Sequence, residues 1–64
     1  MFKISDCSNK RMETEIFNDT RDAVDMIFTI TENEEETKRA IKIMDTMHCG
    51  DIYSAKLFRI TCIE

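Results

Sequence analysis

Glycine is scarce in this sequence, and proline and tryptophan are missing. Among the 64 residues there is one glycine, Gly50, and one histidine, His48. A phosphate-cradling loop needs several glycines, so this class of nucleotide site is excluded. A domain of roughly 60 residues buries only about 60% of the surface that its unfolded chain exposes, which leaves few residues to wall a catalytic cleft. We therefore expect no enzyme, and a single small domain over residues 1–64.

Long hydrophobic runs are missing as well. No apolar stretch approaches the ~18 residues that a membrane-spanning helix requires. The first residues, Met1 to Asp6, lack the charged start and apolar stretch of a secretory signal, so we expect a cytoplasmic protein without a membrane partner. The three cysteines are an odd number, which does not suit a disulfide framework and favours reduced thiols.

The cysteines and the histidine are the best soft-metal ligands in the chain. They are Cys7, His48, Cys49 and Cys62. Zinc sites place ligands in pairs such as Cys-x2-Cys, and no such pair occurs here. We expect no metal and no cofactor, and we keep a Cys/His metal- or thiol-dependent domain as an alternative.

Acidic side chains outnumber basic ones by 13 to 9, which gives a formal net charge of −4. Negative charge repels phosphate, so we expect no direct binding to nucleic acid. The acids gather in two groups: Asp19, Asp22 and Asp25, and Glu32, Glu34, Glu35 and Glu36. Both groups lie at predicted helix starts, where capping and the helix dipole explain part of them. The negative charge that capping and the dipole do not explain suits a basic partner surface, such as the nucleic-acid-binding surface of another protein.

Alternating apolar and polar residues predict strands near the N-terminus. Phe2–Cys7 alternates, with Phe2 and Ile4 on one face. Met12–Phe17 alternates again, and residues 8–10 between the two segments are turn-like, which predicts a hairpin. Residues 20–31 fit either a helix capped by Thr20 or a strand. The cap favours the helix, whose apolar spacing includes Phe28.

The second half of the chain contains the clearest helix pattern. Glu32 to His48 carries an i, i+3, i+4, i+7 apolar stripe, two favourable Glu-to-Lys/Arg pairs, and Gly50 placed to end the helix. Ile52 to Ile63 reads as one strand. The fold class is therefore α+β, a small two-layer sandwich with an antiparallel sheet covered by helices in the order ββααβ, with βββαβ as the alternative.

Small size, acidity and the missing catalytic set favour a non-enzymatic protein-binding module, an inhibitor or modulator that docks on a larger protein. In general character the chain resembles small accessory proteins of bacteriophages, although no motif carries that resemblance. The acidic residues given above are the candidate contacts with the partner. A homodimer is expected too, because Leu57, Arg59 and Ile63 in the last strand provide a candidate self-association surface. A homo-oligomeric structural protein is the alternative function.

Overall fold

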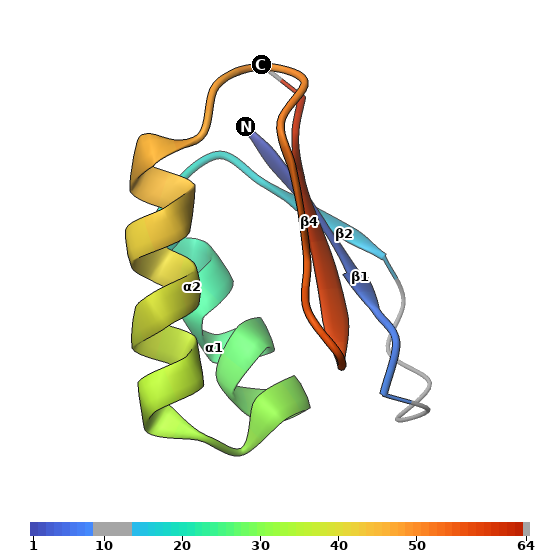
Figure 1. The fold of residues 1–64 in the computed structure, drawn as a ribbon, viewed down its shortest axis with the longest axis vertical. Helices are drawn as coiled ribbons and strands as arrows, with labels where there is room; N and C mark the ends of the chain where they lie inside the picture. Colours follow the sequence, from blue (N-terminus) through green and yellow to red (C-terminus); the bar gives the residue numbers. More distant parts are fainter. Residues whose placement is uncertain (9–13, 64) are drawn as a thin grey trace.

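A computed structural model describes residues 1–8 and 14–63. Its strands form a single sheet, and its helices pack against that sheet. The elements in chain order are β1 (Phe2–Asp6), β2 (Glu15–Phe17), α1 (Thr20–Thr31), α2 (Glu34–Thr46), β3 (Ile52–Ser54) and β4 (Phe58–Cys62), as Figure 1 shows. The sheet has four strands in the order β2-β1-β4-β3, and all neighbours are antiparallel. The predicted α+β class is confirmed.

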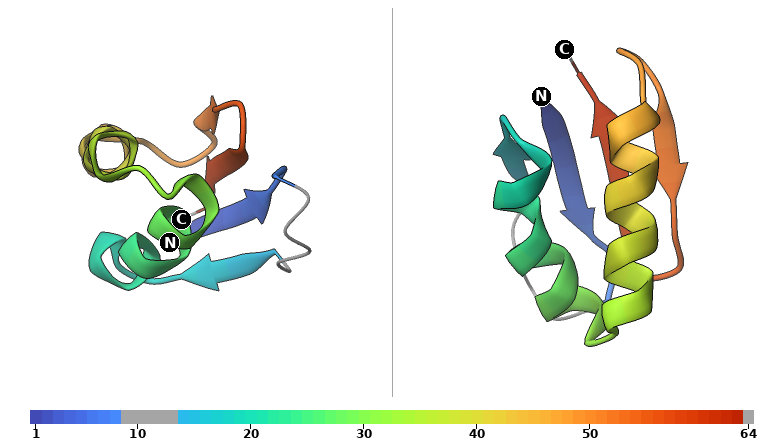
Figure 2. Two further views of the ribbon diagram at one scale, coloured as in Figure 1. Left: turned by 90° about the horizontal axis from the view of Figure 1, so that it is seen from below. Right: turned by 90° about the vertical axis from the view of Figure 1, so that its left-hand side faces the viewer.

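Both helices lie on the same face of the sheet. In Figure 2, α1 lies over the half of the sheet formed by β1 and β2, and α2 lies over the half formed by β3 and β4. This arrangement makes two layers with the hydrophobic core between them. Its largest fully buried side chains are Ile4, Ile27, Ile30, Met44 and Ile60. Among the residues that the structure describes, no helix covers the opposite face of the sheet (Figure 2).

The predicted last strand is in fact a hairpin, and the element order is ββααββ rather than ββααβ. β3 pairs with β4 in antiparallel register, with Tyr53 opposite Ile60. The hairpin closes where the Ala55 N–H donates to the Phe58 carbonyl at 2.9 Å. The connecting residues include no glycine, proline or asparagine, so the sequence lacks the usual signal for a turn there.

Residues 20–31 form a helix, so the strand alternative for this segment is wrong. The cap is Asp19 rather than Thr20, because the Asp19 side chain accepts a hydrogen bond from the Arg21 N–H at 3.1 Å. At its end, Glu32 adopts a left-handed conformation (φ 51°) and its N–H donates to the Phe28 carbonyl at 2.7 Å. The turn to α2 therefore begins immediately after α1.

The predicted second helix is confirmed, with ends that differ from the sequence-based bounds. Asn33 caps α2 by accepting a hydrogen bond from the Glu36 N–H at 3.0 Å. Met47 ends the helix in an extended conformation. Gly50 has a positive φ of 95°, as expected, but it belongs to the turn that leads to β3 and does not cap the helix.

The two N-terminal strands form the predicted antiparallel pair. β1 ends one residue before the predicted boundary, and Glu15–Phe17 is the part of the predicted second strand that the structure assigns as β2. The predicted turn, apart from Ser8, and residues 12 and 13 lie outside the described residues. Phe17 lies opposite Phe2 and packs against the core, so Ile16 is turned to the outer face of the sheet.

Candidate functional site

The solvent-facing side of α1 combines acidic residues with one large aromatic side chain. The helix buries Ala23, Met26, Ile27 and Ile30 against the rest of the protein. Phe28 lies outside this buried stripe, and 49% of it is exposed. The apolar spacing in the sequence placed Phe28 among the core-facing positions. The expectation is wrong because the face that meets the sheet is centred on Ala23, Ile27 and Ile30.

Acidic residues flank the exposed ring along the helix. Asp25 precedes Phe28 by three residues, and Glu32 follows it by four. Asp25 is therefore a neighbour of Phe28, since residues three apart on a helix lie side by side on its surface. Glu32 is the C-cap residue of α1 and follows the last helical residue, Thr31, in a left-handed conformation. Both acidic residues are exposed. We call Asp25, Phe28 and Glu32 the acidic–aromatic face of α1.

An exposed aromatic ring is unusual because burying it would remove a large apolar area from water. Rings of this kind are frequent anchors in protein interfaces, where a partner pocket desolvates them and polar residues form the rim. The acidic–aromatic face has the composition of such an anchor with a negatively charged rim.

The two acidic groups found in the sequence do not form a single patch. Asp19 and Asp22 lie at the start of α1, whereas Glu34, Glu35 and Glu36 form the first turn of α2. The 12 residues of α1 separate these ends by about 18 Å at 1.5 Å per residue, and the helix traced in Figure 1 shows the separation. Asp25, from the first group, lies in the middle of α1, and Glu32, from the second group, is the C-cap residue of α1.

Several of the predicted contact residues stabilise the protein's own helices. The pKa of Asp19 is lowered, first because the Arg21 backbone N–H donates to its carboxylate, and further by the Arg21 guanidinium 3.7 Å away. A lowered pKa means that the ionised cap stabilises the fold above the ordinary pKa of Asp, and that this stabilisation is lost as the pH falls through the folded-state value. Glu34 forms the predicted pair with Lys38 at 3.5 Å. Asp19 and Glu34 thus have structural roles.

The cysteines and the histidine are not brought together. Cys7 and Cys49 are exposed, whereas Cys62 is buried in the core layer. The His48 side chain lies beside Asp51, with 3.7 Å between Nδ1 and the carboxylate. Within residues 1–8 and 14–63, no three His, Cys, Asp or Glu side chains are grouped so that they could hold a metal ion.

The outer face of the sheet contains two of the three predicted self-association residues. Arg59 is exposed there, and Ile63 follows β4 with its N–H donating to the Met1 carbonyl at 3.0 Å. Leu57 lies instead in the β3–β4 turn and packs against the core, which is a correction of the predicted outward position. A single strand through residues 52–63 would have turned Leu57 outward, but the turn rotates it inward.

Two exposed isoleucines on this outer face extend the candidate surface. Ile16 on β2 is 58% exposed, and Ile52 on β3 is 61% exposed. The strand register aligns them in one cross-strand row, Ile16–Lys3–Thr61–Ile52, which we call the outer row. The sequence already predicted that Ile52 contributes to the self-association surface. The alternation in the sequence set Ile16 opposite the glutamates of its strand, but Phe17 is the residue that packs against the core, so Ile16 lies on the outer face.

Comparisons with known proteins return no match. No family model, curated protein or solved structure is similar to this chain. Neither helix in the described part of the chain has the length and apolar character that crossing a membrane requires.

Proposed function

We propose that this protein is a non-enzymatic protein-binding module that docks on a larger protein through the acidic–aromatic face of α1. The observation that carries the proposal is the 49% exposure of Phe28, with the exposed Asp25 beside it on α1 and the exposed Glu32 at the C-cap of the helix. Phe28 is the anchor, and Asp25 and Glu32 are the rim. The matching partner surface is an apolar pocket bordered by Lys and Arg.

A basic border of this kind is typical of surfaces that bind nucleic acid. By occupying such a surface the module acts as an inhibitor or modulator of the larger protein. The net charge of −4 supports this role, because it speeds association with a positively charged partner. The three cysteines form no disulfide with one another, which supports a proposal of binding in the cytoplasm.

The first test measures the electrostatic rim. A partner is captured from host lysate at low ionic strength and purified, and its association rate with the wild-type protein and with Asp25→Lys is then measured over a range of salt concentrations. We expect Asp25→Lys to lower the association rate about tenfold at low salt and to flatten the salt dependence, since rim charges act mainly on the encounter rate.

The matched control is Asp45→Lys, which makes the same change of charge at an exposed position near the end of α2. It should alter the rate less than Asp25→Lys does, and the difference should be clearest at about 0.15 M salt, where charges are screened over about 8 Å. Equal effects of the two substitutions would show that only net charge matters, and would contradict docking by this face.

A second candidate function, self-association through the outer face of the sheet, is favoured by the outer row. A two-fold axis parallel to the strands, through the middle of that row, sets Ile16 against the Ile52 of a second copy and Lys3 against its Thr61. This pairing buries the apolar ends of the row and avoids facing lysines. Arg59, next to this row on β4, faces Ser5 of the second copy in the same arrangement.

Sedimentation equilibrium tests this pairing directly. We expect a reversible dimer of twice the 7.5 kDa chain mass for the wild type and the monomer for both Ile16→Lys and Ile52→Lys. A buried unpaired charge disfavours each altered interface strongly. Phe28→Lys serves as the control and should remain dimeric. A wild type that stays monomeric at millimolar concentration excludes the dimer.

A further inference from the structure

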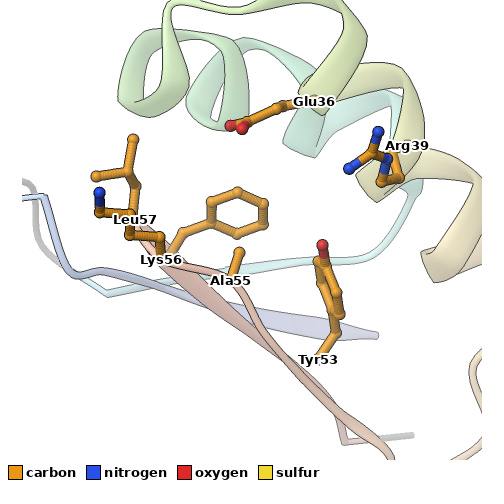
Figure 3. A pocket seen from close by; sticks show the side chains of 7 residues that line it. Glu36, Arg39, Tyr53, Ala55, Lys56 and Leu57 are labelled. Atoms are coloured by element: carbon orange, nitrogen blue, oxygen red, sulfur yellow. The ribbon is translucent and has the colours of Figure 1, made fainter.

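A hollow lies between α2 and the β3–β4 hairpin. It is lined by Glu36 and Arg39 from α2, by Tyr53 from β3, and by Ala55, Lys56, Leu57 and Phe58 from the hairpin turn and the start of β4 (Figure 3). Its volume is about 180 Å³. A protein cavity of about 150 Å³ holds one benzene molecule, so this hollow has room for one six-membered ring.

Apolar groups form the inner surface of the hollow. Phe58 is buried, and its ring meets the Tyr53 ring edge to face with centroids 6.0 Å apart. Ala55 and Leu57 pack against the same core. A small apolar group placed in the hollow therefore meets an aromatic pair and two aliphatic side chains.

Polar groups are placed at the border of the hollow. In Figure 3 the Tyr53 hydroxyl points toward α2 on the side where Arg39 lies, whereas Lys56 lies on the side of Leu57. Arg39 was expected to pair with Glu35, but in the described residues Arg39 forms no ion pair within 4.0 Å, and neither does Lys56. The hollow thus has a hydroxyl donor and two available cations around an apolar surface.

Glu36 reduces the net positive charge of the hollow. Its carboxylate also faces the hollow (Figure 3), so the lining residues carry a net charge of +1 from two cations and one anion. A negatively charged group is attracted by this surface. Arg presents a planar set of donors that matches a carboxylate.

We propose that this hollow is a binding site for a small monocarboxylate with a compact apolar body. The carboxylate is held by the Arg39 guanidinium and the Tyr53 hydroxyl, and the apolar body rests on Phe58, Ala55 and Leu57. This site is on the α2 side of the molecule and is independent of docking by the acidic–aromatic face of α1.

Nuclear magnetic resonance titration of the full chain tests the site with phenylacetate as the probe. We expect phenylacetate to shift the backbone amides of residues 55–58 and the Arg39 side-chain resonance. Two compounds of similar shape, neutral 2-phenylethanol and cationic phenethylamine, should bind at least about fivefold more weakly, because they lack the charge-assisted hydrogen bonds to Arg39.

Matched variants separate the site from general charge effects. Arg39→Gln should weaken phenylacetate binding by about tenfold or more, and Tyr53→Phe by about fivefold while it keeps the ring contact with Phe58. Lys42→Gln removes a cation of the same helix that does not line the hollow, and should change the affinity by less than about twofold. No shift at 20 mM phenylacetate, equal binding of 2-phenylethanol, or equal effects of Arg39→Gln and Lys42→Gln would each overturn the proposal.

Discussion

Replacing Ile60 by alanine is expected to lower the free energy of unfolding by about 2–5 kcal/mol. Ile60 is 0% exposed and lies in a central strand, where β4 pairs with both β1 and β3. It lies opposite Ile4 on one side and Tyr53 on the other, so the substitution removes contacts with both neighbours and leaves a cavity under the helices. The loss is the sum of lost burial and residual cavity.

Such a loss is large for a chain of this size. At about 0.05–0.15 kcal/mol per residue, 64 residues give a total stability of about 3–10 kcal/mol, so Ile60→Ala is expected to remove a large share of it. Urea unfolding followed by circular dichroism measures the change. Ile52→Ala is the matched control: the same atoms are removed from a side chain that is 61% exposed, and the cost should stay below about 1 kcal/mol. Equal costs at the two positions would contradict the assigned core.

Phe28→Ala is expected to weaken binding to the captured partner at least about 30-fold, which corresponds to about 2 kcal/mol. An anchor ring that is desolvated in the complex contributes the most at the centre of an interface, whereas the rim residues tune rate and specificity. The effect should therefore appear mainly in the dissociation rate, in contrast to the association-rate effect of Asp25→Lys.

The folded state of Phe28→Ala should be preserved, because Phe28 lies outside the buried stripe of α1 and alanine has the highest helix propensity. Its urea midpoint, measured beside its affinity, separates lost contact from lost structure. The matched comparison is again Ile52→Ala. Ile52 is an exposed apolar side chain in the sheet layer, and its replacement should alter the affinity for the partner by less than about twofold. If Ile52→Ala weakens the complex more than Phe28→Ala, the outer sheet face is the docking surface and the assignment to α1 is wrong.

Most of the helices and strands were predicted, because hydrophobic periodicity and helix caps are features of neighbouring residues. The two N-terminal strands follow from period-2 alternation, and α2 follows from an apolar stripe beginning with acidic residues. The choice between helix and strand for residues 20–31 depended on the cap, and the structure confirms the helix with the cap one residue earlier at Asp19. The β3–β4 turn was missed because residues 55–57 contain no turn-forming glycine, proline or asparagine.

The candidate site was predicted only in part. The sequence identified the acidic residues and their two groups, but it assigned Phe28 to the apolar face of its helix. It considered Arg39 only as the partner of Glu35 and Tyr53 only beside the self-association residues. Apolar spacing indicates which face of a helix is buried only to within about one residue position, which is about 100° of rotation in an α-helix. A residue at the border of the apolar stripe can therefore be either buried or exposed. For Phe28, the packing of α1 over β1 and β2 decides the outcome (Figure 2).

By itself the sequence determined the fold class, the two helices and the acidic charge, because these depend on composition and on contacts within a few residues. Only the tertiary structure decided which side chains share a surface. Strand register joins Ile16 to Ile52 across the whole sheet, and the hairpin brings Tyr53 to Arg39 of α2. Pairings between residues far apart in the chain depend on how the two layers pack, and no local pattern carries that information.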